Sequence, residues 1–354
     1  MKHEAPMLHR HNHEAVDCTL HDIQNCDQSF GGLTVVFGGD FKQILPVIVK
    51  GSRAQIVSAS LCRSRLWGFI EVLRLTENMR LNTMHEAEKQ FAAWQLEMGR
   101  GEHTDESDFI HLPDHFRCAE NSVQSLIDTI YPDIRLPHGD EYYAERTILC
   151  SKNDDVDDVN AVILQQFPGD VKVYHSSDNV VDSGSDGPIL YPAEYLNTIN
   201  CSGLPLAKLK LKKGCPVMIL QNLNASEGLC NGSRGIVTQL GNRVLEVRLL
   251  TGEQAGEKVF IPRRANKPTD SQVPFKFCRR QYPVRVAFAM SINKSQGQSV
   301  KHVGLNLVNP VFTHGQLYVA VSRVTSVHNI KVILDEEVEG TKTKNIVYPE
   351  VIID

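Results

Sequence analysis

A glycine-rich turn carries side chains that could take part in catalysis or ligand binding. Gly38 and Gly39 follow the apolar run 33–37 and are followed by Asp40 and Gln43. The apolar run predicts a β-strand, and two glycines after it predict a sharp turn at the carboxyl end of that strand. Open α/β proteins bind their ligands at this edge of the sheet. We therefore expect this turn to lie in a ligand crevice, where Gln43 senses a phosphate group.

Charged side chains at three other places could complete a site for nucleotide hydrolysis. Glu4 belongs to the sequence HEAPM, Arg80 ends the segment LTENMR, and Arg323 belongs to LYVAVSRV. Hydrolysis between two domains needs a metal ligand, a group that orients water, and positive charge near the transferred phosphoryl group. These side chains are of the required kinds. Taken alone, each arginine is more often an ordinary surface residue at a helix end.

The segment 291–300, SINKSQGQSV, combines a predicted strand exit with a lysine and with a glutamine that precedes glycine. The family resemblance described next implies that this segment couples the ligand crevice to a partner. The plainer alternative is a polar helix cap after a buried strand.

The order and spacing of the segments 38–47, 75–80, 291–300 and 317–324 resemble those of the Pif/RecD-like DNA helicases of superfamily one. Within that family, the amino-acid sequences of these motifs most resemble those in the helicase part of Helitron transposons. The resemblance implies an ATP-dependent DNA helicase that moves in the 5′ to 3′ direction on single-stranded and forked DNA. It also implies ATP as the substrate and Mg²⁺ as the metal ion.

The resemblance assigns roles to residues of this chain. It makes Glu4 the water-orienting group and a Mg²⁺ ligand, Gln43 a γ-phosphate contact, and Arg80 and Arg323 phosphate-stabilising groups. The nucleotide-binding set that it implies is Gly39, Asp40, Gln43, Gln296 and Gly297. The DNA-binding candidates are Ser291, Asn293, Lys294, Ser295 and Arg234. Asn293 departs from the histidine that often stands at its position in the family, and the sequence leaves open whether Arg234 contacts phosphate or water.

One family motif does not occur in the printed sequence. No GxxxxGK[ST] string is present, and His3 stands where a magnesium-binding aspartate is expected before Glu4. We therefore expect a fragment that begins inside the second helicase motif, with negligible ATPase activity of its own and a poorly soluble first domain. The alternatives are a catalytically inactive helicase remnant that only binds DNA, and a plain α/β domain in which the motif matches arise by chance.

The expected fold class is α/β, with two RecA-like parallel-sheet domains, of which the first is incomplete, and a small β-barrel inserted in the second. Residues 1–76 are assigned to the first domain, 77–168 and 283–354 to the second, and 169–282 to the inserted 2B-like barrel. The barrel is predicted because five short β-branched runs follow one another between glycines and prolines. These runs are 171–174, 217–220, 235–240, 244–249 and 258–261.

Hydrophobic periodicity predicts further elements. An amphipathic helix is expected to bury Leu8, Val16, Leu20 and Ile23 against the strand 33–37. Trp67 and Phe69 are expected in the core, and 176–188 is expected to be a mobile surface loop. The remaining predicted helices are 86–98, one that begins near 153, and 317–324, and the remaining strands are 147–150, 303–307 and 330–334.

Charge is distributed unevenly along the chain. The formal net charge is −5, yet the stretch 258–301 holds ten Lys or Arg residues against Asp270 alone, whereas 102–158 holds fifteen acidic and four basic residues. A protein that holds a phosphate backbone needs positive charge only on the face in contact. The stretch 258–301 is therefore a candidate DNA-contacting face, and a solvated basic loop is the alternative.

The remaining composition restricts the class of protein. The nine cysteines contain no C-x-x-C pair, which argues against a zinc knuckle and fits a reducing compartment such as the nucleus or the mitochondrion. His9, His11 and His13 are interpreted as a polar helix start rather than a metal site. No apolar run approaches the roughly 20 residues of a membrane-spanning helix. The oligomeric state is not predicted.

Overall fold

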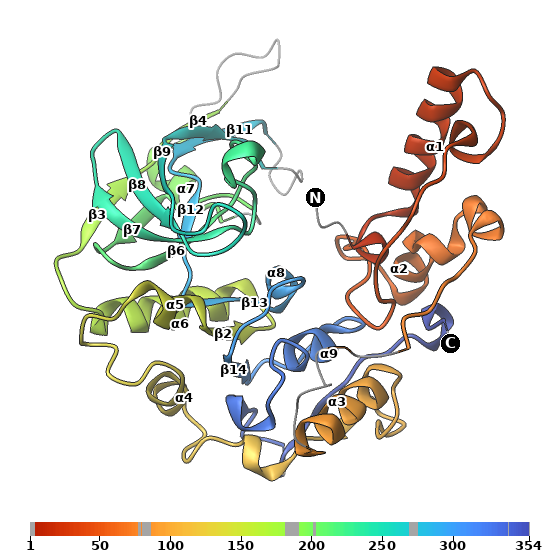
Figure 1. Cartoon of the computed structure of the whole chain (residues 1–354). Helices are drawn as coiled ribbons and strands as arrows, with labels where there is room; N and C mark the ends of the chain where they lie inside the picture. The colour runs from red at the N-terminus through yellow and green to blue at the C-terminus, as the bar shows by residue number, and fades with distance from the viewer. Residues whose placement is uncertain are drawn as a thin grey trace. The chain divides into compact units, whose positions relative to one another are not determined.

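The computed structural model describes residues 4–76, 79, 86–180, 191–200, 203–268, 275–338 and 340–353. The chain forms two compact units (Figure 1). Unit 1 comprises residues 1–129, 149–153 and 291–354, and unit 2 comprises 130–148 and 154–290. The unit boundaries pass through two strands, β2 (Arg146–Cys150) and β13 (Ala289–Ser291). No helix in the described part of the chain combines the length and hydrophobicity that crossing a bilayer requires.

Unit 1 contains the parallel strand pair that the sequence predicts. β14 (His302–Leu307) pairs in parallel with β15 (Ile330–Leu334), with Val303 opposite Ile330. The full sheet order is β13-β2-β14-β15, and a small antiparallel pair joins β1 (Phe109–His111) to β16 (Lys342–Lys344). All residues of β14 from Val303 onward are buried, as a parallel strand covered on both faces requires.

Unit 1 also contains several helices. α9 (Gln316–Val321) is buried at every residue, and α3 (Glu86–Gly99) packs against it (Figure 1). The α-helices besides these are α1 (Arg10–Gln24), α2 (Arg53–Ala59), α4 (Val123–Ile130) and α8 (Ile292–Ser295). The short 3₁₀ helices are η1 (Ala5–Met7), η2 (Ser29–Gly32), η3 (Leu61–Arg63), η4 (Arg65–Phe69), η6 (Asp114–Phe116), η8 (Val327–Asn329) and η9 (Pro349–Val351).

The strand predicted at 33–37 is wrong. These residues are not assigned to a strand, and Val36 is 89% exposed. The sequence is apolar enough for a buried strand, but strand hydrogen bonds need a neighbour, and no strand lies within the described residues 4–76. The predicted parallel sheet of the first domain is therefore not seen in this part of the chain.

The predicted buried face of α1 is partly wrong, since Leu8 and Leu20 are half-buried but the other two members are not. Val16 and Ile23 are exposed, and the helix instead buries His13 and Asp17, which lie four residues apart on one face. Asp17 accepts a hydrogen bond from the backbone N–H of Phe30 (2.7 Å). The two polar side chains are buried because they serve other groups: Asp17 a backbone donor, and His13 the carbonyl of Ala5 (3.3 Å).

Of the two aromatic residues predicted to lie in the core, only one contacts it. Trp67 is half-buried and meets the ring of Phe41 edge-on, whereas Phe69 is 76% exposed. Both lie in η4, where consecutive residues of a 3₁₀ turn point in different directions.

Unit 2 is predominantly antiparallel. Its largest sheet has the order β12-β6-β7-β8-β9, and two smaller sheets are β10-β11-β4 and β3-β5. The strands are β3 (Lys172–His175), β4 (Ser177–Val180), β5 (Lys208–Leu211), β6 (Pro216–Ile219), β7 (Arg234–Leu240), β8 (Val244–Leu249), β9 (Lys258–Pro262), β10 (Arg264–Asn266), β11 (Phe277–Gln281) and β12 (Val284–Val286). The five predicted runs match β3, β6, β7, β8 and β9 to within about two residues. The described strands form three sheets and do not close into one barrel, so the barrel stays a prediction.

The helices of unit 2 are α5 (Asp140–Ala144), α6 (Asn153–Gln166), α7 (Ala193–Thr198) and η7 (Ala225–Glu227). α6 begins where the sequence predicts and buries Val156, Val159 and Ile163. The predicted loop 176–188 is partly wrong, because Ser177–Val180 forms β4; residues 181–188 lie outside the described residues. β4 is ordered because Asp178 pairs with Arg279 on the neighbouring strand β11. The sequence predicts three domains, whereas the chain divides into two compact units; the borders of the three domains stay a prediction.

Candidate nucleotide site

The two segments predicted to begin the site lie against each other in unit 1. The backbone N–H of Ala5 donates to the carbonyl of Gly38 (2.9 Å). A Cβ atom on Gly39 would lie 2.2 Å from Cδ of Pro6, so only glycine permits this approach. The glycine turn is thus needed for close packing against the HEAPM segment, and it brings Glu4 near Asp40.

Glu4 also contacts the SINKSQGQSV segment. Its Oε2 atom accepts a hydrogen bond from Nε2 of Gln296 (3.1 Å), and a Cβ atom on Gly297 would lie 3.9 Å from its Oε1 atom. Residues almost 300 positions apart in the chain are therefore neighbours, as the sequence predicts for members of one site. The hydrogen bond fixes the orientation of the Gln296 amide.

Two buried amide oxygens have no hydrogen-bond partner among the described residues. They are Oε1 of Gln43 and Oε1 of Gln296. Buried side-chain amides in proteins nearly always have partners, because an unpaired one costs about 1–3 kcal/mol. In each amide, the Oε1 atom is left to accept a hydrogen bond from a ligand or from water. Both residues belong to the predicted nucleotide-binding set.

Asp40 and Tyr318 connect the glycine turn to α9. The Tyr318 hydroxyl donates to Oδ2 of Asp40 (2.9 Å), while Oδ1 of Asp40 accepts from the backbone N–H and from Nζ of Lys42 (3.0 Å each). Burial, followed by the negative charge of Asp40, raises the pKa of Tyr318 far above its ordinary value. Arg323 and Glu4 also act on this hydroxyl, so all four groups share one neighbourhood.

The start of α9 packs directly on the same turn. A Cβ atom on Gly315 would lie 2.5 Å from the carbonyl oxygen of Lys42, and its φ of +72° is one that glycine adopts without strain. Next to it, Nε2 of the fully buried His314 donates to the carbonyl of Phe41 (2.8 Å), and its Nδ1 accepts from the N–H of Tyr348 (2.8 Å). Burial lowers the pKa of His314, so the neutral ring holds both contacts.

Arg323 holds the end of the SINKSQGQSV segment. One guanidinium nitrogen donates to the carbonyls of Ser295 (3.2 Å) and Gln298 (2.9 Å), and Nε donates to the carbonyl of Val319 (2.9 Å). These carbonyls lie at the ends of two helices, where a cation is favoured. The structure therefore places Arg323 between α8 and α9, and a contact with phosphate stays a prediction.

The predicted DNA-binding residues of this segment differ in their surroundings. Asn293 is half-buried, and its Oδ1 atom accepts from Gln316 (2.9 Å). Ser291 and Lys294 are also half-buried. Ser295 is a correction: it is buried, and its hydroxyl donates to the carbonyl of Ile292 one helical turn back (2.7 Å), so its side chain is turned into the protein and has almost no exposed surface.

Arg234 is a second correction. Its side chain is only 1% exposed, and its guanidinium donates to the carbonyls of Tyr143, Ala144, Arg146 and Ala287 at 2.8–3.4 Å. Burial lowers its pKa. It therefore has almost no surface to offer to DNA or solvent, and it holds backbone segments of unit 2 together.

The basic stretch 258–301 is also less available to a partner than its composition indicates. Arg279 and Arg285 form ion pairs with Asp178 and Asp157, and Lys258 pairs with Glu246. Exposed basic side chains of the stretch include those of Arg264, Lys267, Lys276 and Arg280.

The structure does not describe one predicted site residue, and it shows no preformed metal site among the described residues. Arg80 lies outside the described residues. No group of three or more His, Cys, Asp or Glu side chains within the described residues is arranged to hold a metal ion. Sequence reasoning also missed Tyr318, His314 and Gln316. The signal that could have found them is their place in one short segment, 314–323, that ends at Arg323.

The comparisons with known proteins agree with this geometry. Residues 1–108 match the PIF1-like helicase family, and residues 194–240 match the DNA helicase Pif1 2B domain. Over these two stretches the chain is similar to the PIF1-like helicases. The second match lies inside the region 169–282, for which the sequence predicts an inserted 2B-like domain.

Curated relatives of this chain are named ATP-dependent DNA helicase PIF1. The one from Danio rerio is 30% identical over 93% of this chain and 45% of its own length. The one from Homo sapiens is 29% identical with the same coverage. The chain thus spans about half the length of the curated relatives it matches.

Solved structures show the same fold. Bacteroides Pif1 bound to ssDNA superposes with a TM-score of 0.62 at 22% identity, covering 99% of this chain and 71% of that one. Pif1 helicase from Candida albicans has a TM-score of 0.61 at 21% identity, covering 93% and 71%. The RecA-like fold class predicted from the sequence is confirmed.

Proposed function

We propose that this chain acts as part of an ATP-dependent DNA helicase of the Pif type, which couples ATP hydrolysis to movement along single-stranded DNA. The observation that carries the proposal is the convergence of four distant segments in unit 1. The HEAPM turn, the glycine turn, the SINKSQGQSV segment and α9 meet through Glu4, Asp40, Gln296 and Tyr318. A structural core has no need of so many polar side chains in one place.

The two unpaired amides suit contact with a phosphoryl group. In this proposal, Gln43 donates an amide N–H to a phosphate oxygen, and the Oε1 atoms of Gln43 and Gln296, which now lack partners, accept hydrogen bonds from water around the bound phosphate. Glu4 would orient the attacking water. Its position, held by Gln296, is within reach of the same ligand.

The carboxylates present fit a Mg²⁺ ion that is shared with the substrate. Mg²⁺ in nucleotide-hydrolysing enzymes takes one or two protein carboxylates and completes its shell with phosphate oxygens and water. Glu4 would be the protein ligand, because both oxygens of Asp40 already accept hydrogen bonds. When bound, the ion would neutralise charge on the phosphates.

Arg323 suits the transmission of a change at the nucleotide to the DNA-contacting segment. It donates to carbonyls at the end of α8 while its own helix packs on the glycine turn. A shift of α9 on nucleotide binding would therefore move Ser291, Asn293 and Lys294. We propose that this is how hydrolysis drives movement, in the 5′ to 3′ direction, on single-stranded and forked DNA.

A second candidate is a helicase remnant that binds DNA without hydrolysing ATP. It is favoured by one observation: the printed sequence contains no GxxxxGK[ST] string to cradle the phosphates. By this reasoning, residues 1–354 alone have negligible ATPase activity. We further propose a nuclear or mitochondrial location, with which the eight described cysteines, none of which forms a disulfide, are consistent.

Binding of a labelled oligothymidylate to the purified chain, followed by fluorescence anisotropy, tests the DNA-binding part of the proposal. We expect an affinity that is largely indifferent to sequence and falls steeply with salt. Lys294→Gln should weaken it, whereas Lys89→Gln, a lysine change in α3 outside the site, should not. No binding at low salt would overturn the proposal. DNA-stimulated ATPase by the same sample would exclude the inactive remnant.

A further inference from the structure

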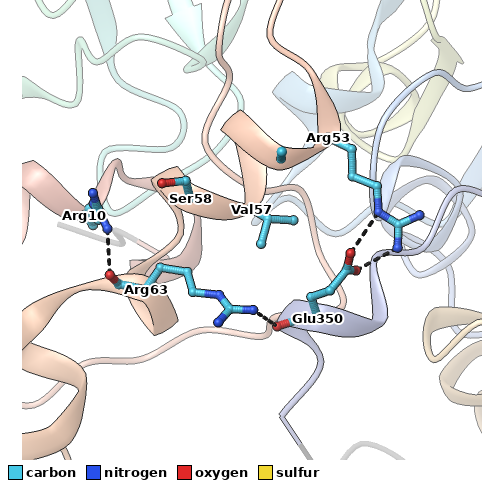
Figure 2. A pocket seen from close by; sticks show the side chains of 7 residues that line it. Arg10, Arg53, Val57, Ser58, Arg63 and Glu350 are labelled. Atoms are coloured by element: carbon cyan, nitrogen blue, oxygen red, sulfur yellow. Dashed lines mark hydrogen bonds and ion pairs between the residues drawn. The ribbon is translucent and has the colours of Figure 1, made fainter.

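A hollow of about 660 Å³ in unit 1 is lined by three arginines and one glutamate (Figure 2). Arg10 comes from α1, Arg53 from α2, Arg63 from η3 and Glu350 from η9. Ala54, Val57 and Ser58 of α2 supply the small and apolar part of the lining. None of these residues belongs to the candidate nucleotide site around Glu4, Tyr318 and Arg323, and the proposed function uses none of them.

Glu350 forms an ion pair with one of the three arginines, Arg53. Arg53 donates from Nε and Nη2 to the two carboxylate oxygens of Glu350 (3.1 and 2.7 Å), as Figure 2 shows. This fork is the geometry in which arginine also binds phosphate. Both side chains are open to water, at 50% and 41% exposure. An ion pair this exposed contributes little stability, so another anion can replace the carboxylate at small cost.

The other two arginines have donors to spare. Arg10 donates from Nη1 to the carbonyl of Arg63 (2.7 Å), but its Nε atom is buried without a partner among the described residues. Arg63 reaches the backbone carbonyl of Glu350 at 3.5 Å, the limit of a hydrogen bond. Figure 2 shows both guanidinium groups at the hollow. Three guanidinium groups against one carboxylate leave an excess of two positive charges.

We propose that Arg10, Arg53 and Arg63 form a binding site for a phosphate group, and that Glu350 is an internal anion that the phosphate displaces from Arg53. A phosphate dianion matches the excess charge and offers enough acceptor oxygens for the unpaired donors. The phosphate can belong to a free anion or to a nucleic-acid backbone, since both present the same oxygens.

Titration of the full chain with pyrophosphate, followed by calorimetry, tests the site itself. We expect Arg63→Gln and Arg10→Gln each to weaken binding by about fivefold or more, because each removes a charge-assisted hydrogen bond. Glu350→Gln should instead tighten binding, by about threefold or more, because Arg53 loses its competing carboxylate. The matched control is Arg100→Gln, an exposed arginine near Glu102 that does not line the hollow.

Titration of the same variants with an oligothymidylate distinguishes the two sources of phosphate. Weakened binding of both probes identifies a backbone phosphate, and weakened binding of pyrophosphate alone identifies a free anion; either result supports the site. Pyrophosphate binding that is equal in Arg63→Gln, Arg10→Gln and Arg100→Gln overturns it. If an arginine variant fails to fold, Glu350→Gln decides, since unchanged affinity in that variant contradicts the proposed competition.

Discussion

Two groups of arginines in this molecule teach different lessons about the same side chain. In unit 2, Arg234 and Arg279 are each only 1% exposed and are surrounded by backbone carbonyls. In unit 1, Arg10, Arg53 and Arg63 line an open hollow and keep donors without partners or with exchangeable ones. The first group holds the fold together, and the second is available to a ligand. Positive charge in a sequence therefore indicates a partner only after the internal acceptors are known.

The largest expected effect is that of Arg279→Met. Arg279 pairs with the buried Asp178 and donates to the carbonyls of Leu196, Ile199 and Pro205. Its loss leaves a buried carboxylate unpaired, which costs about 3–5 kcal/mol of unfolding free energy. Denaturant unfolding measures this, with the exposed neighbour Arg280→Met as control. Equal midpoints for the two variants would contradict the structural role.

Arg234→Met should have the next largest effect, about 2–3 kcal/mol, because several carbonyls lose a shared donor. In contrast to a DNA-binding arginine, its replacement should leave the salt dependence of DNA affinity unchanged in the folded protein. The measurements are thermal unfolding and a salt titration of oligothymidylate binding. A reduced salt slope would restore Arg234 as a phosphate contact and blur the distinction between the two groups.

A smaller effect is expected from His314, which resembles the buried arginines although it lies in unit 1. Its pKa is lowered by burial from 6.5, so the unfolded chain takes up a proton before the folded chain does. Stability should thus decline as the pH falls below about 6.5 and be unaffected by this group above that pH. His314→Gln should flatten that decline, whereas His328→Gln, an exposed histidine, should not. Unfolding at several pH values checks the difference.

The smallest expected effect is that of Arg53→Gln on stability. Because the pair with Glu350 is half exposed, its removal should change the unfolding free energy by less than about 1 kcal/mol. A loss as large as that of Arg279→Met would show that the hollow is a structural feature rather than a place kept open for a ligand.

Some elements were predictable from the sequence because local pattern decides them. β8 and β15 have the predicted bounds, and α3 differs by one residue, since buried β-branched runs and a glycine stop are local signals. The strand 33–37 failed because strand formation depends on a neighbour that the pattern does not contain. The prediction of the buried face of α1 failed because Asp17 is buried, where it accepts a hydrogen bond from a backbone N–H thirteen residues away.

The candidate site was predictable in its membership more than in its contacts. The sequence placed Glu4, Gln43, Gln296 and Arg323 in one site, and the structure brings Glu4 to Gln296 and brings Glu4 and Arg323 near Tyr318. The sequence did not reveal that Arg323 donates to carbonyls, or that Arg234 is buried. Both facts depend on which acceptors surround a guanidinium, and those acceptors come from distant parts of the chain.

The central claim is that the glycine turn and α9 form one site, and a double-mutant cycle on Asp40 and Tyr318 tests it most directly. Asp40→Asn and Tyr318→Phe, alone and together, are compared by denaturant unfolding, with Tyr195→Phe, an exposed tyrosine of unit 2, replacing Tyr318→Phe in a control cycle. The 2.9 Å hydrogen bond predicts a coupling of about 0.5–3 kcal/mol in the first cycle and additivity in the second. Additive effects of Asp40→Asn and Tyr318→Phe would contradict the account.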